Sequence, residues 1–122
     1  MKIKDIIAKI DFVEPNQYDN DQKMEWLSAL DGKIFLELIM THHHPHCIEF
    51  VPYTDIEQEL LVGAPYDNDL YGYFLQMKIA DFNQETILFN KQATLYNNAY
   101  QEYANYYNRT HMPITHRNRF RF

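Results

Sequence analysis

The residues best suited to chemistry lie in one short cluster that offers five metal donors within six positions. The donors are His42, His43, His44, His46 and Cys47. Imidazole and thiolate are good zinc ligands, but adjacent histidines point apart, Pro45 prevents a helix from bringing His42 and His46 together, and no second ligand pair elsewhere completes a tetrahedron. We therefore expect an exposed polar loop without a bound cofactor, and a metal-binding protein is kept as an alternative function.

The motifs that commonly mark an enzyme do not occur in the sequence. It has no glycine-rich phosphate loop, no nucleophile elbow and no HExxH pair. Asp67 and Asp69 are better explained as helix-start residues, which the helix dipole favours, than as an acid and base pair. A single cysteine excludes an internal disulfide, as is typical of a reducing compartment. We expect a protein without catalytic activity that is made in the cytoplasm.

Charge is divided unevenly along the chain. The net charge is −6, which argues against a general nucleic-acid binder because neutralising phosphate requires a basic surface. Residues 109–122 nevertheless carry four arginines and no acid, whereas the preceding 108 residues hold 7 basic and 17 acidic side chains. Such a tail could contact the acidic body of a neighbouring copy, could be a solubilising end, or could bind phosphates in a DNA-binding regulator.

The hydrophobic pattern predicts an all-α fold, a small bundle of about four helices. The length suits a single helical domain, residues 1–112, followed by a basic extended tail over 113–122. Four isoleucines at helical spacing predict a first helix that stops before Pro15. No apolar run approaches the roughly 18 residues that a membrane-spanning helix requires.

A second helix is predicted from a cap at Asp19 or Asn20 to about Thr41. Gly32 within it indicates either close approach of another helix, which we favour slightly, or a tolerated weak point. The helical period is lost over residues 42–65, apart from a short extended segment near 48–53 and a helical turn near 56–62. Because a loop this long within a compact domain is usually functional, we expect partner contact there.

The stretch that organises the chain runs from residue 66 to residue 113 and holds eight of the ten tyrosines. Apolar residues at helical spacing in both halves predict two long helices folded back on each other. A short acidic or amide side chain at positions 67–69 can cap the first of them. Without Gly or Pro to mark the corner, we place it at Asn90, with Asn97 and Asn98 as options and one long bent helix as the competing hypothesis.

Tyrosine suits a surface that is buried in an assembly yet exposed in the free subunit, although a wet helical core is an equal alternative. Tyr106 lies about a hundred degrees from the stripe that the other late tyrosines share, so the rings cannot all occupy one face. We therefore expect an interface that combines these tyrosines with the arginines. Its residues are Tyr96, Tyr100, Tyr103, Tyr106, Tyr107, Arg109, Arg117, Arg119 and Arg121.

An ordered set of short motifs resembles a family of small proteins encoded in tailed phages and prophages of Gram-positive bacteria. The motifs are Pro15-Asn16, Lys23, Trp26-Leu27, Leu30-Asp31-Gly32-Lys33-Ile34, Leu60-Leu61-Val62, Ala64-Pro65-Tyr66-Asp67, Leu70-Tyr71 and Tyr103–Pro113. They extend over nearly the whole chain, and YANYYNRTHMP is the most specific of them. The sequence departs from the family at HHHPHC, where relatives carry a short acidic or glycine-containing loop.

The resemblance implies a structural role rather than a chemical one. Genes of this family lie among those of virion structural proteins, which implies a head-tail connector, or neck, subunit similar to the helical adaptors that form a ring beneath the portal. The implied partners are further copies of the chain and portal or tail proteins, with DNA nearby but no sequence-specific binding to it. The implied location is the host bacterial cytoplasm during assembly and then the virion.

Overall fold

Four α-helices form most of the protein in a computed structural model that describes residues 1–39 and 50–110. They are α1 (Ile3–Val13), α2 (Asn20–Ile34), α3 (Asp67–Phe82) and α4 (Thr86–Thr110), and a π-helical turn, η1 (Phe35–Ile39), continues α2. Within these two ranges no strand occurs, and the single isolated bridge joins Lys2 to Glu59. The prediction of an all-α bundle of about four helices is therefore confirmed.

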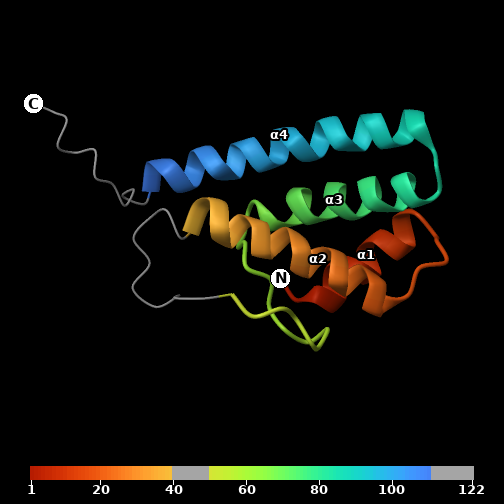
Figure 1. The fold of residues 1–122 in the computed structure, drawn as a ribbon, viewed down its shortest axis with the longest axis horizontal. Helices are drawn as coiled ribbons and strands as arrows, with labels where there is room; N and C mark the ends of the chain where they lie inside the picture. Colours follow the sequence, from red (N-terminus) through yellow and green to blue (C-terminus); the bar gives the residue numbers. More distant parts are fainter. Residues whose placement is uncertain (40–49, 111–122) are drawn as a thin grey trace, which may run out of the picture.

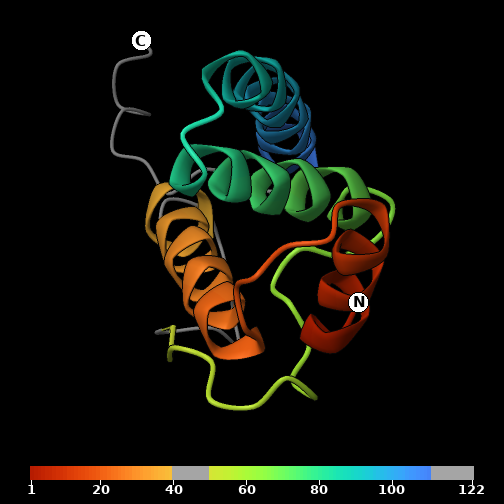
Figure 2. The same ribbon diagram turned by 90° about the vertical axis from the view of Figure 1, so that its right-hand side faces the viewer.

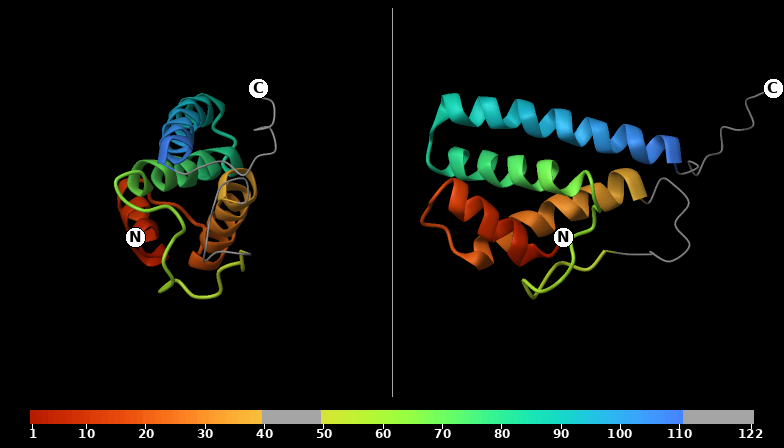
Figure 3. Two further views of the ribbon diagram at one scale, coloured as in Figure 1. Left: turned by 90° about the vertical axis from the view of Figure 1, so that its left-hand side faces the viewer. Right: turned by 180° about the vertical axis from the view of Figure 1, so that it is seen from behind.

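The helix α3 lies in the middle of the bundle (Figures 1 and 2). α4 runs antiparallel to it on one side, whereas α1 and α2 pack on the other side and against each other. Figure 3 shows that the α1–α2 connection and the α3–α4 turn share one end of the bundle, which we call the turn end. α4 finishes at the opposite end. No helix in the described part of the chain is long and apolar enough to span a bilayer.

One hydrophobic core joins all four helices. The isoleucines that predicted α1 are buried in it, and the other helices contribute leucines, aromatic rings and Ile79. Its most buried apolar members are Ile3, Ile6, Leu27, Ile34, Val62, Leu70, Tyr71, Leu75 and Ile79. The spacing of the isoleucines identified the inward face of α1 correctly, because residues three and four apart share a helix face. For α3 it did not single out Tyr71, Leu75 and Ile79, which are completely buried.

The N-terminus of α1 is closed by a distant segment. The Ile3 N–H donates to the Gln58 carbonyl at 3.0 Å, and the Lys4 N–H donates to the Ile56 carbonyl at 2.9 Å. The opening turn of a helix leaves N–H groups without internal partners, and this segment supplies the missing acceptors. The helical turn predicted over 56–62 is reduced to a single hydrogen-bonded turn, in which the Gln58 N–H donates to the Asp55 carbonyl at 3.0 Å. It goes no further because the Ile56 and Gln58 carbonyls face α1 instead of an ongoing helix.

The start of α2 agrees with the prediction. The Asp19 carboxylate accepts from the Gln22 N–H at 2.8 Å, as an N-cap does. The predicted end near Thr41 lies outside the described residues, which follow the helix as far as Ile39. At Gly32, a Cβ atom would lie 3.6 Å from a ring carbon of Phe50, so the neighbour of this glycine is a loop residue in ordinary contact rather than another helix.

The α3–α4 corner does not lie at Asn90, Asn97 or Asn98 as predicted, but at residues 83–85. The Glu85 N–H donates to the Ala80 carbonyl at 2.9 Å and the Gln84 N–H donates to the Asp81 carbonyl at 3.1 Å. These two bonds are those of a Schellman motif, in which the residue after the C-cap adopts a left-handed conformation. That residue is Gln84, with φ of 61°. The corner escaped notice because glutamine fills a position that glycine usually occupies.

The start of α3 also differs from the prediction. α3 begins at Asp67 with Tyr66 as its N-cap, and no side chain caps it. The Asp67 carboxylate instead accepts from the adjacent Asn68 N–H at 2.7 Å. Asp67 and Asp69 therefore lie in the first turn, where the helix dipole favours acidic residues.

Candidate functional site

A buried carboxylate joins three segments of the chain. Asp31 on α2 is completely buried, and its carboxylate accepts from the Tyr71 hydroxyl of α3 at 2.6 Å and from the Tyr53 hydroxyl. The Leu61 N–H also donates to it, at 3.2 Å. The two phenol oxygens accept in turn from the backbone, Tyr71 from the Val62 N–H at 2.9 Å and Tyr53 from the Leu61 N–H at 3.1 Å. We call Asp31, Tyr53, Tyr71 and the N–H groups of Leu61 and Val62 the Asp31 cluster.

Burial dominates the electrostatics of this cluster. It raises the pKa of Asp31 above its ordinary value, against the opposing effect of the hydrogen bonds from Tyr53, Tyr71 and Leu61. Burial next to the same carboxylate raises the pKa of Tyr71 far above its usual range. Since both side chains are completely buried, they are not open to a substrate. The cluster therefore serves to fix the segment that follows Phe50 against α2 and α3.

A second buried charge holds the α1–α2 connection. The Lys23 side chain on α2 is only 1% exposed, and its ammonium pairs with the Asp11 carboxylate at the end of α1. Asn16 also donates to that carboxylate, at 3.1 Å. A buried ammonium needs such a partner because an unpaired charge in an apolar environment costs roughly several kcal/mol of free energy. This pair fixes one side of the turn end.

The tyrosines predicted for an interface divide into two groups. Tyr96, Tyr103 and Tyr107 are buried in the core of the single chain, where the rings of Tyr103 and Tyr107 lie 6.0 Å apart. Tyr100 and Tyr106 are half-buried and pack against the same core. For the first three, the structure therefore supports the alternative of a helical core, and their rings are not offered on the surface.

The half-buried pair makes contacts within the chain as well. The Tyr100 hydroxyl donates to the Glu37 carboxylate of η1 at 2.6 Å, and the Lys33 ammonium lies 5.3 Å from the centre of the Tyr100 ring. Tyr106 stacks on Tyr66 with ring centres 4.8 Å apart. Burial, assisted by Glu37, raises the pKa of Tyr96 to about 12. These rings join α4 to η1 and to the residue that precedes α3.

Several predicted residues fall outside the part of the chain that the structure describes. They are His42, His43, His44, His46 and Cys47 of the donor cluster and Arg117, Arg119 and Arg121 of the tail. Arg109 is described and lies exposed in the last turn of α4. Over residues 1–39 and 50–110, no three His, Cys, Asp or Glu side chains are arranged to hold a metal ion.

The outer side of α4 carries an unusual set of exposed residues. Six uncharged polar residues in the middle of the helix are what we call the amide face: Asn90, Thr94, Asn97, Asn98, Gln101 and Asn105. The charged residues of α4 are Lys91, Glu102 and Arg109. Because α3 covers the inner side and neither α1 nor α2 packs closely on α4, this face has no partner helix in the described chain.

The turn end carries the largest exposed apolar side chains. Phe12 and Ile87 are each 88% exposed, Val13 is 58% exposed and Phe82 is 52% exposed. We call these four residues the turn-end patch. The exposed part of Phe82 belongs to a ring whose centre lies 5.1 Å from that of Trp26 and 5.9 Å from that of Tyr18. Phe82 is therefore held in place by these two rings.

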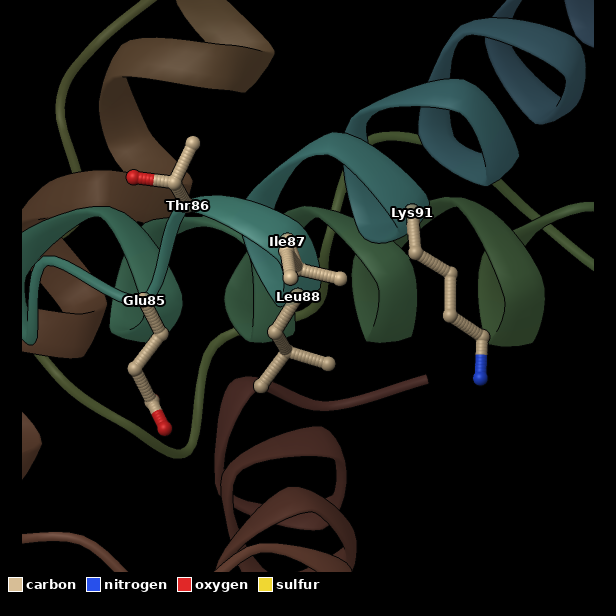
Figure 4. Close-up of a pocket in the computed structure, with 5 residues that line it drawn as sticks. All are labelled: Glu85, Thr86, Ile87, Leu88 and Lys91. Atoms are coloured by element: carbon tan, nitrogen blue, oxygen red, sulfur yellow. The ribbon is translucent and has the colours of Figure 1, made fainter.

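Acidic side chains predominate in the segments that carry the turn-end patch, although Asp11 is paired with Lys23 and Lys91 borders the start of α4. Residues 11–22 and 79–90, which flank the two connections, contain six acidic and no basic side chains. Burial, together with the negative charge of Glu85, raises the pKa of Glu14 above its ordinary value. Figure 4 shows a shallow depression at the start of α4, where Ile87 and Leu88 lie between Glu85 and Lys91. The surface thus combines apolar groups with negative charge.

Sequence reasoning missed both the Asp31 cluster and the turn-end patch. Asp31 falls four residues after Leu27 and three before Ile34, on the apolar stripe of α2, and this position was a signal of a buried carboxylate. Nothing in the sequence marked Ile87 as an exposed residue, because the predicted corner at Asn90 placed it inside the preceding helix. Phe12 lies two residues after the last buried isoleucine of α1, and its position off the stripe was visible.

The protein is a small all-α bundle whose hydrophobic core contains a buried polar group, the Asp31 cluster. Comparisons of the chain with protein-family models, curated proteins and solved structures found no match.

Proposed function

We propose that this protein is a structural subunit without catalytic activity, which binds further copies of itself and neighbouring proteins as a head-tail connector of a tailed phage. The motif resemblance supplies the biological setting, with the portal or tail proteins as neighbours. In this proposal the chain is made in the host bacterial cytoplasm and is then incorporated in the virion.

The observation that carries the proposal is the amide face of α4. Exposed helix faces usually hold charged residues, and asparagine forms helices less readily than Lys, Glu or Gln. Yet asparagine supplies four of the six residues of this face. A local preference that a sequence violates commonly marks a functional surface. Charged residues are depleted in the cores of protein interfaces, and uncharged amides are easier to desolvate there.

The occupant of the amide face is a second copy of the chain. The described ranges hold 16 acidic and 8 basic residues, so copies repel each other over most of their surface. α4 itself carries two basic residues and one acidic residue, so it adds little to this repulsion. α4 has 25 residues and is therefore about 37 Å long, enough for an extended lateral contact.

The oligomeric state of the full-length, untagged protein tests this proposal. We expect light scattering behind a sizing column to show a discrete oligomer over a hundredfold range of concentration. The double substitution Asn98→Glu and Gln101→Glu adds negative charge to the amide face and should reduce association at least tenfold. The matched control, Ala8→Glu with Ala29→Glu, adds the same charge at exposed positions of α1 and α2 and should leave association within about twofold. A monomer at every concentration would overturn the proposal.

The connector role is tested in the phage or prophage that encodes the chain. Deleting the gene should give filled heads and separate tails, which electron microscopy distinguishes from intact particles. A normal yield of joined particles after the deletion would reject the connector role while leaving self-association intact.

A further inference from the structure

Phe12 and Ile87, the most exposed members of the turn-end patch, are left largely uncovered by the described chain, whereas one side of Phe82 packs on Trp26 and Tyr18. A single exposed apolar residue is common, but here four large ones belong to segments that lie at one end of the bundle (Figures 1 and 3), the last turns of α1 and α3 and the first turn of α4. Of the six most exposed large apolar residues in the described ranges, only Leu36 and Val51 lie elsewhere. A grouped set of this kind marks a surface that binds another chain.

The chemistry of the patch defines what would bind it. Apolar side chains would fill the space beside Phe12, Phe82 and Ile87, and cations would pair with the carboxylates around them. Two of these carboxylates, Glu14 and Glu85, repel each other, so a cation near them is attracted by both charges. The complementary ligand is therefore a peptide that alternates basic and aromatic residues.

The last residues of this same chain have that composition. Arg119, Phe120, Arg121 and Phe122 alternate guanidinium groups with aromatic rings, after Arg117. Residues 111–122 contain no acid. The segment thus matches the turn end in both apolar character and charge.

The tail leaves the bundle at the wrong end to reach its own patch. α4 ends at Thr110, opposite the turn end (Figure 1). Residues 111–122 are 12 residues, which span at most about 40 Å when fully extended, and α4 alone is about 37 Å long. Only the final residue or two could reach the patch of the same copy, and only if the whole segment were fully extended. A neighbouring copy has no such restriction.

We propose that residues 111–122 of one copy bind the turn end of the next copy, with Phe120 and Phe122 against the turn-end patch and the arginines beside its carboxylates. The proposal rests on the proposed function in that both require copies to associate, but it concerns a different surface from the amide face. Because the two surfaces in contact differ, the contact is heterologous and builds either a closed ring or an open chain.

A direct binding measurement tests the contact. The probe is a fluorescent synthetic peptide of residues 111–122, titrated with full-length protein that carries Phe120→Ser and Phe122→Ser, so that no intact tail competes. We expect saturable binding by anisotropy that weakens several-fold between 50 and 300 mM salt, roughly as screening of guanidinium–carboxylate pairs requires. A peptide with both phenylalanines replaced by serine should bind at least tenfold more weakly.

The patch is tested by substituting its two most exposed residues. Adding Phe12→Ser and Ile87→Ser to the titrated protein should weaken peptide binding at least tenfold, and circular dichroism should show an unchanged fold because both side chains are 88% exposed. Adding Asn98→Glu and Gln101→Glu instead should leave peptide binding unchanged. Absence of saturable binding, or binding insensitive to Phe12→Ser and Ile87→Ser, would overturn the proposal.

Complementation of two full-length variants gives an independent test. The tail variant, Phe120→Ser with Phe122→Ser, keeps an intact patch, and the patch variant, Phe12→Ser with Ile87→Ser, keeps an intact tail. With the amide face also blocked by Asn98→Glu and Gln101→Glu, each variant alone should be monomeric and their mixture should form a one-to-one dimer. If the mixture stays monomeric, the tail contact fails, whereas the amide-face proposal is still decided by its own experiment.

Discussion

In the Asp31 cluster a carboxylate is completely buried, whereas at the turn end Phe12 and Ile87 are each 88% exposed. Both regions place a side chain in the environment that it normally avoids. Around Asp31 the chain supplies two hydroxyl donors and one backbone N–H. Around Ile87 it supplies only a shallow depression.

The difference shows which region is complete within one chain. A buried polar group that is fully hydrogen-bonded gives a fixed structure, because losing any partner leaves another group unpaired. An exposed apolar group gains nothing in the isolated subunit and becomes buried only when another molecule covers it. Mutations in the first region should therefore act on folding, and those in the second on association.

The largest effect is expected from Asp31→Ala. The substitution removes the acceptor of Tyr53, Tyr71 and the Leu61 N–H, and should lower the free energy of unfolding by about 3 kcal/mol. Urea unfolding followed by the fluorescence of Trp26 measures it. Asp21→Ala, at an exposed position of the same helix, is the control and should change stability by less than about 0.5 kcal/mol. A loss below about 1 kcal/mol for Asp31→Ala would contradict the importance of the cluster.

A smaller loss is expected from Tyr71→Phe. The ring still fills its buried site, but the Asp31 carboxylate loses a donor and the Val62 N–H loses its acceptor. The free energy of unfolding should fall by about 2 kcal/mol, measured in the same way. Tyr73→Phe, which changes a half-buried tyrosine of α3, should lower the free energy of unfolding by less than about 0.5 kcal/mol. Equal effects of the two substitutions would show that the hydroxyl of Tyr71 adds no special stability.

The pH dependence of stability gives a third test. Because burial raises the pKa of Asp31 in the folded protein, the folded state holds this proton more tightly than the unfolded chain. The contribution of Asp31 is therefore fully present below the ordinary value near 3.8 and is lost as the pH rises through the raised folded value. Unfolding free energies between pH 4 and pH 7 should fall less steeply for Asp31→Asn than for the native chain. A parallel pair of profiles would mean that Asp31 binds its proton equally in both states.

The smallest effect on folding is expected at the turn end. Ile87→Ser removes an apolar side chain that is already in solvent, so the free energy of unfolding should change by less than about 0.5 kcal/mol. Leu75→Ala, in the completely buried part of α3, should lose about 3 kcal/mol and serves as the contrast. A loss near 3 kcal/mol for Ile87→Ser in monomeric protein would mean that Ile87 belongs to the core and not to an interface.

The helices were predictable because their signals are local. The spacing of the isoleucines fixed the buried face of α1, and Asp19 fixed the start of α2 through a bond to the Gln22 N–H three residues on. The α3–α4 corner was missed because Gln84 adopts a left-handed conformation that propensity assigns to glycine. The course of segment 56–60 was missed because the N–H groups that donate to its carbonyls lie at the N-terminus of α1, more than fifty residues away.

The sequence by itself determined the fold class, the inward face of α1 and the division of charge between an acidic body and a basic tail, since each depends on residue type and short-range spacing. Only the tertiary structure decided that Tyr96, Tyr103 and Tyr107 belong to the core and that Asp31 joins α2, α3 and the segment after Phe50. It also decided that the ends of α1 and α3 and the start of α4, which carry Phe12, Phe82 and Ile87, lie at one end of the bundle. These facts depend on how helices distant in sequence pack together, which local spacing does not encode.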